Sequence, residues 1–133
     1  MARPGFFAID SLASVHVLVV DDDPASREEL ITLLRYCGAL VTVAESDAEA
    51  LRVLDTVKPD LVVIAVARRH RGEITLVRIV RARKPEASGV VPIVAVLAQG
   101  ETLDPRSGVT LQLTRPLDAW RVCRALASLI AGQ

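Results

Sequence analysis

Three consecutive carboxylates, Asp21, Asp22 and Asp23, follow an apolar run that begins at Val15. Like charges packed this closely repel one another unless a cation lies nearby. Carboxylate oxygens bind hard metal ions such as Mg²⁺, and they form charge-assisted hydrogen bonds with basic side chains. We therefore expect a cation, either a metal ion or a basic side chain, beside these aspartates.

The apolar run from Val15 to Val20 is typical of a strand buried on both faces, as in parallel α/β sheets. The aspartates then lie at the carboxyl end of that strand, where open α/β sheets place their sites. Asp23 followed by Pro24 is a typical helix start, with an N-cap residue and a proline at the first helical position. We predict that this helix ends at Gly38.

The rest of the chain alternates between apolar runs and amphipathic stretches. We predict strands at residues 40–44, 60–65, 90–97 and 109–114, and helices at residues 46–57, 73–84 and 118–131. Residues 99–108 include Gly100, Pro105 and Gly108, which disfavour a helix, so a loop with at most one turn is expected there. This alternation predicts a doubly wound α/β fold, in which helices cover both faces of a five-stranded parallel sheet.

Length and composition limit the possible classes of protein. The 133 residues suffice for one domain, which we place at residues 15–131. A leader, residues 1–14, precedes it and forms either an extra turn or a disordered arm, which could pack on the domain or on a partner. The 16 basic and 16 acidic residues cancel, and no apolar run approaches the roughly 18 to 20 residues that span a bilayer. We therefore expect a cytoplasmic protein with neither a nucleic acid nor a membrane as partner.

Cys37 and Cys123 fit no metal or redox spacing and are predicted to be small core residues.

Four motifs, in this order along the chain, resemble the strand ends of the response-regulator receiver domain of two-component signalling. They are Leu18-Val-Val-Asp-Asp-Asp-Pro, Lys58-Pro-Asp-Leu-Val-Val-Ile, Val91-Pro-Ile-Val-Ala-Val and Thr114-Arg-Pro-Leu. The resemblance implies a flavodoxin-like receiver fold with strand order 2-1-3-4-5. The segment between the fourth and fifth strands is shorter than the family leads us to expect, so the fourth helix of that fold should be short or missing.

The resemblance also implies which positions of this chain correspond to the functional residues of the family. At several of these positions the chain has a different type of residue. Asp21 and Asp22 match the pair of carboxylates that holds Mg²⁺ in the family, whereas Ala65 stands at the phosphoacceptor aspartate. Leu97 stands at the switch Ser or Thr, and Arg115 replaces a lysine that pairs with the phosphate. A methyl group accepts no phosphoryl group and binds no metal. We therefore interpret the chain as a degenerate pseudo-receiver without a resident cofactor, in which Mg²⁺ binds weakly at best.

Two arrangements of the aspartates remain open. In the first, Arg115 or one of Arg68, Arg69 and Arg71 reaches an aspartate and replaces the metal ion. In the second, the aspartates are solvated and the arginines form a separate surface. Two interpretations also remain open for the three arginines of the 68–71 loop. They either bind an acidic partner or neutralise the charge of nearby acidic side chains.

The chain ends directly after the last predicted helix, which leaves no room for an output domain. We therefore expect a stand-alone signalling module, a monomer or a homodimer, that binds a protein such as a histidine kinase or another regulator independently of phosphorylation. Trp120 on the last helix is the candidate anchor of that contact. Two alternatives are a true phosphoacceptor that uses an unconventional acid, and a small-molecule-binding flavodoxin-like domain. No Gly-rich loop, Ser-His-Asp set or metal cluster predicts an enzyme.

Overall fold

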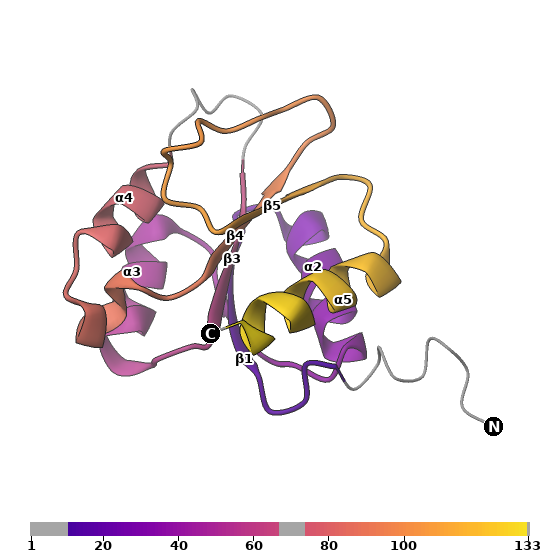
Figure 1. The fold of residues 1–133 in the computed structure, drawn as a ribbon, viewed down its shortest axis with the longest axis horizontal. Helices are drawn as coiled ribbons and strands as arrows, with labels where there is room; N and C mark the ends of the chain where they lie inside the picture. Colours follow the sequence, from indigo (N-terminus) through magenta and orange to yellow (C-terminus); the bar gives the residue numbers. More distant parts are fainter. Residues whose placement is uncertain (1–10, 67–73, 133) are drawn as a thin grey trace.

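The structure, a computed structural model, describes residues 11–66 and 74–132. Its elements alternate along the chain between strands and helices (Figure 1). In order they are β1 (His16–Val20), α2 (Pro24–Tyr36), β2 (Leu40–Ala44), α3 (Asp47–Thr56), β3 (Leu61–Ala65), α4 (Thr75–Arg81), the π-helical turn η1 (Pro85–Gly89), β4 (Ile93–Leu97), β5 (Leu111–Thr114) and α5 (Ala119–Ala131).

The five strands form one sheet in the order β2-β1-β3-β4-β5, and every neighbouring pair is parallel. Parallel neighbours require crossover connections, which helices supply everywhere except between β4 and β5. The prediction of a doubly wound five-stranded parallel sheet with strand order 2-1-3-4-5 is therefore confirmed.

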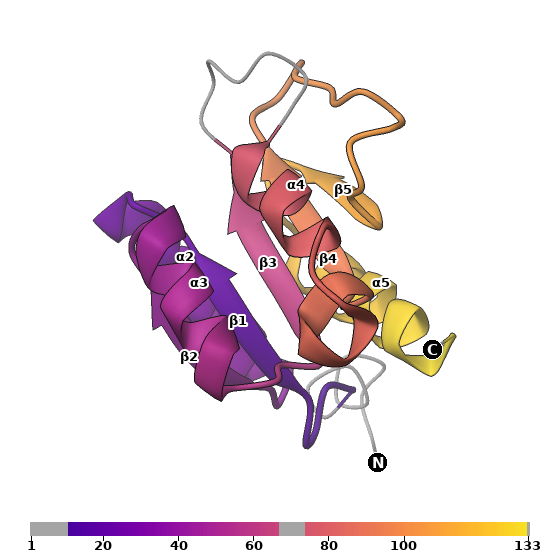
Figure 2. The same cartoon turned by 90° about the vertical axis from the view of Figure 1, so that its left-hand side faces the viewer.

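Side chains of each strand alternate between the two faces of the sheet, and both faces are covered. Val17 and Val19 of β1 pack under α2 and α5, whereas Leu18 and Val20 pack under α3 and α4. Figures 1 and 2 show the two helical layers on opposite sides of the sheet. Burial on both faces explains why β3 and β4 consist of unbroken aliphatic runs.

The first helix begins and ends where the sequence predicts. The side chain of Asp23 accepts a hydrogen bond from the Ala25 amide at 3.3 Å and caps α2. Gly38 follows the helix with a φ of +93°, in the left-handed region, and its amide donates to the carbonyl of Arg35 at 2.9 Å. A glycine is favoured at this position because a side chain would strain a left-handed backbone.

Two boundaries differ most from the prediction. The helix predicted at residues 73–84 is α4, which ends at Arg81 and is followed by the π-helical turn η1. A residue that precedes a proline disfavours the helical conformation, so Pro85 limits the helix. The fourth strand begins at Ile93 and not at Val90, because Pro92 has no amide to donate to a neighbouring strand.

Residues 98–110 connect β4 to β5 without a helix, as the shortened segment predicts. Leu103 of this connection is 6% exposed and packs on Ala95 and Leu97 of β4. One leucine thus covers part of the sheet face that a helix between these strands would otherwise cover.

Arg81, the last residue of α4, fixes this connection to the rest of the domain. Its guanidinium donates to the carbonyls of Val91 at 2.6 Å and Gly89 at 3.1 Å. It also donates to the carbonyl of Gly108 at 2.9 Å and to Oγ1 of Thr110 at 3.2 Å. Burial lowers the pKa of Arg81 below its ordinary value. The four acceptors tie α4, η1 and the 98–110 connection to one side chain.

None of the helices in the described ranges is long and apolar enough to cross a membrane.

The two cysteines are fully buried, as predicted, but they are joined in a disulfide that we did not predict. Cys37 caps α2 and Cys123 lies on α5, and their Cα atoms are 5.8 Å apart. This separation is typical of disulfides. The sequence analysis missed this disulfide because the two cysteines are 86 positions apart in sequence and meet only when α2 and α5 pack on the same face of the sheet.

We expect the Cys37–Cys123 disulfide to stabilise the domain by about 4 to 5 kcal/mol, because it closes a long loop in the unfolded chain. The measurement is urea unfolding with and without dithiothreitol. The double variant Cys37→Ala with Cys123→Ala is the control, and its unfolding midpoint should not respond to the reductant. Alkylation of two free thiols in the unreduced, denatured protein would contradict this prediction.

Candidate functional site

The candidate site lies at the carboxyl edge of the sheet, where β1 and β3 end side by side. Val20 is paired with Ile64, so the next residues, Asp21 and Ala65, lie beside each other. A hollow of about 490 Å³ opens at this point. It is lined by Asp21, Asp22, Asp23, Ser26, Ala65, Val66, Val96 and Arg115.

Asp21 is only 4% exposed, and its carboxylate is fully engaged within the protein. Its Oδ1 accepts a hydrogen bond from the Asp23 amide at 3.0 Å, and its Oδ2 accepts one from the Ser26 hydroxyl. A buried carboxylate is tolerated only when such donors compensate its lost hydration. The start of α2 therefore supplies the partners that this aspartate needs.

Arg115 reaches the aspartate indirectly. Its Nη2 donates to Oγ of Ser26 at 2.5 Å, and its Nη1 forms an ion pair with Glu29. The chain of contacts runs from Glu29 through Arg115 and Ser26 to Asp21. Among the described residues, a serine hydroxyl therefore stands between Arg115 and the carboxylate of Asp21.

The other predicted site residues are distributed around this network. Asp22 is exposed and faces the same hollow as Ala65. Leu97 is 1% exposed and belongs to the core beneath the 98–110 connection. Arg68, Arg69 and Arg71 lie outside the described residues.

Ser26 and Glu29 were missed by the sequence analysis. Both lie on α2, and the predicted N-cap at Asp23 already placed Ser26 in the first turn of that helix. A first helical turn packs close to the end of the strand that precedes it. The spacing from Asp21 to Ser26 was therefore the available signal, whereas the contact with Arg115 spans 89 positions and has no local signature.

A second surface feature surrounds Trp120 on α5. The ring is 37% exposed, and the guanidinium of Arg124 lies 5.9 Å from its centroid. Trp120 borders a hollow of about 720 Å³ between α2 and α5. Tyr36, which is 53% exposed, lies on the α2 side of this α2/α5 groove. The sequence analysis identified Trp120 but missed Tyr36 and the groove.

Comparison with known proteins places this site in a family. No protein-family model matches the chain. An uncharacterized 14.6 kDa protein in the sodA1 3′ region of Leptolyngbya boryana is 35% identical over 120 residues, which are 87% of this chain and 90% of that protein. The transcriptional regulatory protein GlrR of Escherichia coli K12 is 34% identical over 107 residues, which are 77% of this chain.

Solved structures extend the comparison to the whole fold. The receiver domain of Francisella response regulator 1452 is 26% identical, with a TM-score of 0.72 over 90% of this chain and 98% of that domain. This chain belongs to the response-regulator receiver family. The receiver domain of a sensor histidine kinase from Pseudomonas aeruginosa, with a magnesium ion coordinated in its active-site cleft, has a TM-score of 0.75 over 90% of this chain and 99% of that domain. Its identity of 24% supports the shared fold alone.

The chain spans only 23% of the length of GlrR. What GlrR does as a whole protein is therefore not carried over to this receiver domain.

Receiver domains bind Mg²⁺ in the active site, and we tested whether the residues here fit such an ion. Within residues 11–66 and 74–132, no group of three or more His, Cys, Asp or Glu side chains is placed to hold a metal ion. Both oxygens of Asp21 already accept hydrogen bonds, and Ala65 offers no oxygen. The described residues therefore supply no set of three such ligands for the ion.

We expect Ser26 and Arg115 to stabilise the domain jointly. Arg115→Met should lower the free energy of unfolding by about 1 to 2 kcal/mol, because it removes a hydrogen bond and an ion pair. In a double-mutant cycle with Ser26→Ala, the coupling should reach about 0.5 kcal/mol or more. Arg121→Met, which changes an exposed arginine at the start of α5, is the control and should have little effect. Strictly additive changes would show that the contact contributes nothing.

Proposed function

We propose that this receiver domain is a pseudo-receiver that transmits signals through protein contacts independently of phosphorylation. The observation that carries the proposal is the alanine at the end of β3. Ala65 lies beside Asp21 and presents a methyl group to the hollow at the carboxyl edge of the sheet. A phosphoryl group needs a nucleophilic oxygen to attack its phosphorus, and this side chain has none.

The network around Asp21 supports the same proposal. In a phosphoryl transfer, a metal ion and a basic side chain neutralise the charge that develops on the phosphoryl oxygens. Here the carboxylate of Asp21 accepts hydrogen bonds from Ser26 and from the Asp23 amide. Arg115 donates hydrogen bonds to Ser26 and to Glu29. We propose that Mg²⁺ binds weakly or not at all, and that the domain has no enzymatic activity of its own.

Leu97 also supports this function. At the end of β4 it fills core space with an aliphatic side chain, where the family resemblance leads us to expect a hydroxyl. A leucine donates no hydrogen bond, so it provides no switch that responds to a phosphate. The one alternative with a specific observation in its favour is phosphorylation of Asp22, an exposed carboxylate that faces the hollow.

We expect no phosphorylation-like response in the natural protein. In amide NMR spectra, Mg²⁺ and Mg²⁺ with beryllofluoride should leave the signals of Asp21, Ala65 and Arg115 unchanged, because an alanine stands at the acceptor position. Ala65→Asp should make these signals respond to Mg²⁺, since it adds a carboxylate beside Asp21. Ala65→Asn is the matched uncharged control and should stay much less responsive.

A beryllofluoride-dependent shift in the natural protein would contradict the proposal. If that shift disappeared in Asp22→Asn, the acceptor would be Asp22, and the chain would be a true phosphoaccepting regulator.

Receiver domains interact with histidine kinases and other proteins, and we propose that this one binds such a partner through the α2/α5 groove. Trp120 and Tyr36 are large, amphipathic and exposed on either side of this groove. Aromatic anchors of this kind carry a large share of the binding energy in protein interfaces. We keep Arg68, Arg69 and Arg71 as a proposed second contact for an acidic partner.

Trp120 is the only tryptophan in the chain, so its fluorescence reports directly on the groove. Titration with a histidine kinase or regulator from the same organism should shift its emission to shorter wavelength as the ring is desolvated. Trp120→Ala should weaken binding, measured by calorimetry, by about tenfold or more. Leu40→Ala changes an exposed leucine at the start of β2 and should leave the affinity unchanged. Equal affinities for the Trp120→Ala and natural proteins would exclude the groove as the contact surface.

A further inference from the structure

The Cys37–Cys123 disulfide lies next to the α2/α5 groove. Tyr36, which lines the groove from α2, directly precedes Cys37. Trp120, which lines it from α5, lies one helical turn before Cys123. The amide of Cys37 also donates to the carbonyl of Leu33, a further lining residue, at 3.2 Å. The disulfide therefore joins the two walls of the groove close to its exposed aromatic side chains.

The helix α2 is held towards α5 at both of its ends. At its start, the guanidinium of Arg115 contacts Ser26 and Glu29. At its end, the disulfide holds it. Residues from both ends of α2 line the groove, which therefore extends between these two contacts. Of the two, only the disulfide can be broken and formed again by a redox reaction.

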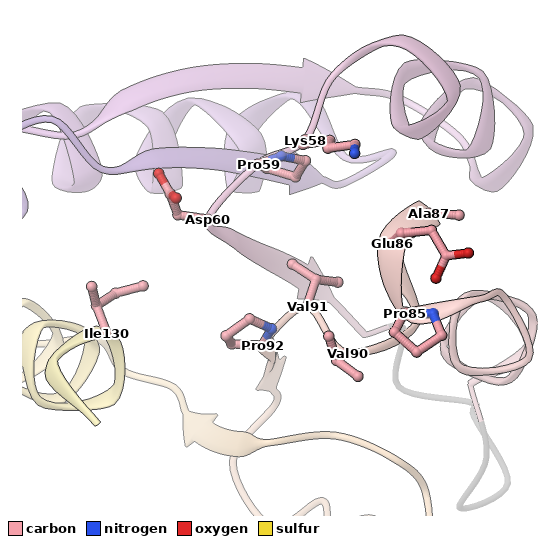
Figure 3. Close-up of a pocket in the computed structure, with 10 residues that line it drawn as sticks. All are labelled: Lys58, Pro59, Asp60, Pro85, Glu86, Ala87, Val90, Val91, Pro92 and Ile130. Carbon is pink, nitrogen blue, oxygen red and sulfur yellow. The ribbon is translucent and has the colours of Figure 1, made fainter. Parts of the chain in front are cut away.

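A second hollow beside α5 provides a contrast. Its volume is about 330 Å³, and it lies where β3 and β4 begin, with η1 on one side and Ile130 of α5 on the other (Figure 3). The described residues that line it lie before β3, in η1, before β4 and on α5. The disulfide joins α5 to α2 and therefore does not connect the walls of this hollow.

A short turn, residues 11–14, covers the disulfide at Cys37. Both cysteines are fully buried. Leu12 is equally buried in the same core cluster, and its amide donates to the carbonyl of Cys37 at 2.9 Å. Ser14 in this turn has a φ of +67°, in the left-handed region that is unfavourable for a residue with a side chain. Displacement of this strained turn is a local opening that gives a reductant access to Cys37 while the sheet stays intact.

Reduction of the disulfide takes place by exchange with a dithiol reductant. One thiolate of the reductant attacks Sγ of Cys37, and the bond between the two cysteines breaks. Its electron pair leaves with Sγ of Cys123, which takes up a proton. The second thiolate of the reductant then attacks the mixed disulfide and releases Cys37, which is also protonated. The products are two protein thiols and the oxidised, cyclic form of the reductant.

Breaking the bond changes the packing between the two helices. The two sulfur atoms then take the larger spacing of non-bonded neighbours. Because the surrounding core is close-packed, this spacing moves the end of α2 away from α5. A domain of this length buries enough apolar surface to remain folded without a disulfide.

We infer that the Cys37–Cys123 disulfide is a redox switch that sets the width of the α2/α5 groove. The reduced protein has the wider and more mobile groove, and the oxidised protein has the narrower one. The consequence that partner binding depends on the redox state rests on the proposed function, whereas the change in the groove itself does not.

Amide hydrogen exchange of the protein with and without dithiothreitol tests the switch. The amides of Leu34 and Tyr36, at the end of α2, should exchange about tenfold faster after reduction. This acceleration should exceed that of Leu51 and Leu54 in α3, which packs on the opposite face of the sheet. Addition of glutathione disulfide should restore the slow exchange. No acceleration, or the same acceleration in α2 and α3, would overturn the inference, since the disulfide would then affect only global stability.

Trp120, the only tryptophan of the chain, provides a second measurement in the same samples. Acrylamide should quench its fluorescence more strongly after reduction, because a wider groove admits more of the quencher. The double variant Cys37→Ala with Cys123→Ala is the control, and dithiothreitol should change neither its exchange rates nor its quenching. A response of this variant to the reductant would show that the effect does not come from the disulfide.

The role of the 11–14 turn is tested by the rate at which dithiothreitol releases the two thiols. Leu12→Ala should increase this rate about tenfold more than Leu54→Ala, which removes a similarly buried leucine on the opposite face of the sheet. Equal rates in the two variants would contradict the local opening and with it the switch, because reduction would then require global unfolding.

The inference and the proposed function fail in different ways. If reduction leaves the groove unchanged in the isolated protein, the switch is excluded and the contact surface is unaffected. If the groove responds to reduction but Trp120→Ala binds the histidine kinase as tightly as the natural protein, the contact surface is excluded. When both hold, the affinity for the kinase, measured by calorimetry, should differ between the oxidised and the reduced protein.

Discussion

Burial of a parallel sheet on both faces is the constraint on which the rest of this structure depends. The central strands must present aliphatic side chains to both helical layers, as Val17 and Leu18 do on opposite faces of β1. A strand that is apolar on both faces leaves polar chemistry to its ends. The carboxyl ends of β1, β3 and β4 consequently meet at one edge, where the candidate site is built.

At the carboxyl edge, one buried carboxylate organises its surroundings. Asp21 has lost nearly all contact with water, so it depends on hydrogen bonds from the start of α2. Ser26 supplies one of them and at the same time accepts from Arg115, which pairs with Glu29. A serine hydroxyl that is itself held by an arginine thus hydrogen-bonds this aspartate, in a family whose active site can hold a magnesium ion.

The connection between β4 and β5 shows how a fold tolerates the loss of an element. Without a helix in residues 98–110, the sheet face is covered by Leu103, and the backbone is held by the guanidinium of Arg81. A planar guanidinium presents several donors in a fixed geometry, so one side chain can satisfy carbonyls from separate segments. Packing and hydrogen bonding here come from two residues and not from a continuous amphipathic surface.

The sequence alone determined the strands, the cap of the first helix, the strand order through its family resemblance, and the position of Ala65 next to the aspartates. These features depend on local periodicity or on motifs only a few residues long. The Ser26–Arg115 contact, the Cys37–Cys123 disulfide and the α2/α5 groove were decided by the tertiary structure. Each joins segments roughly 80 to 90 positions apart, and no local pattern specifies which distant side chains meet when two helices pack on the same face of a sheet.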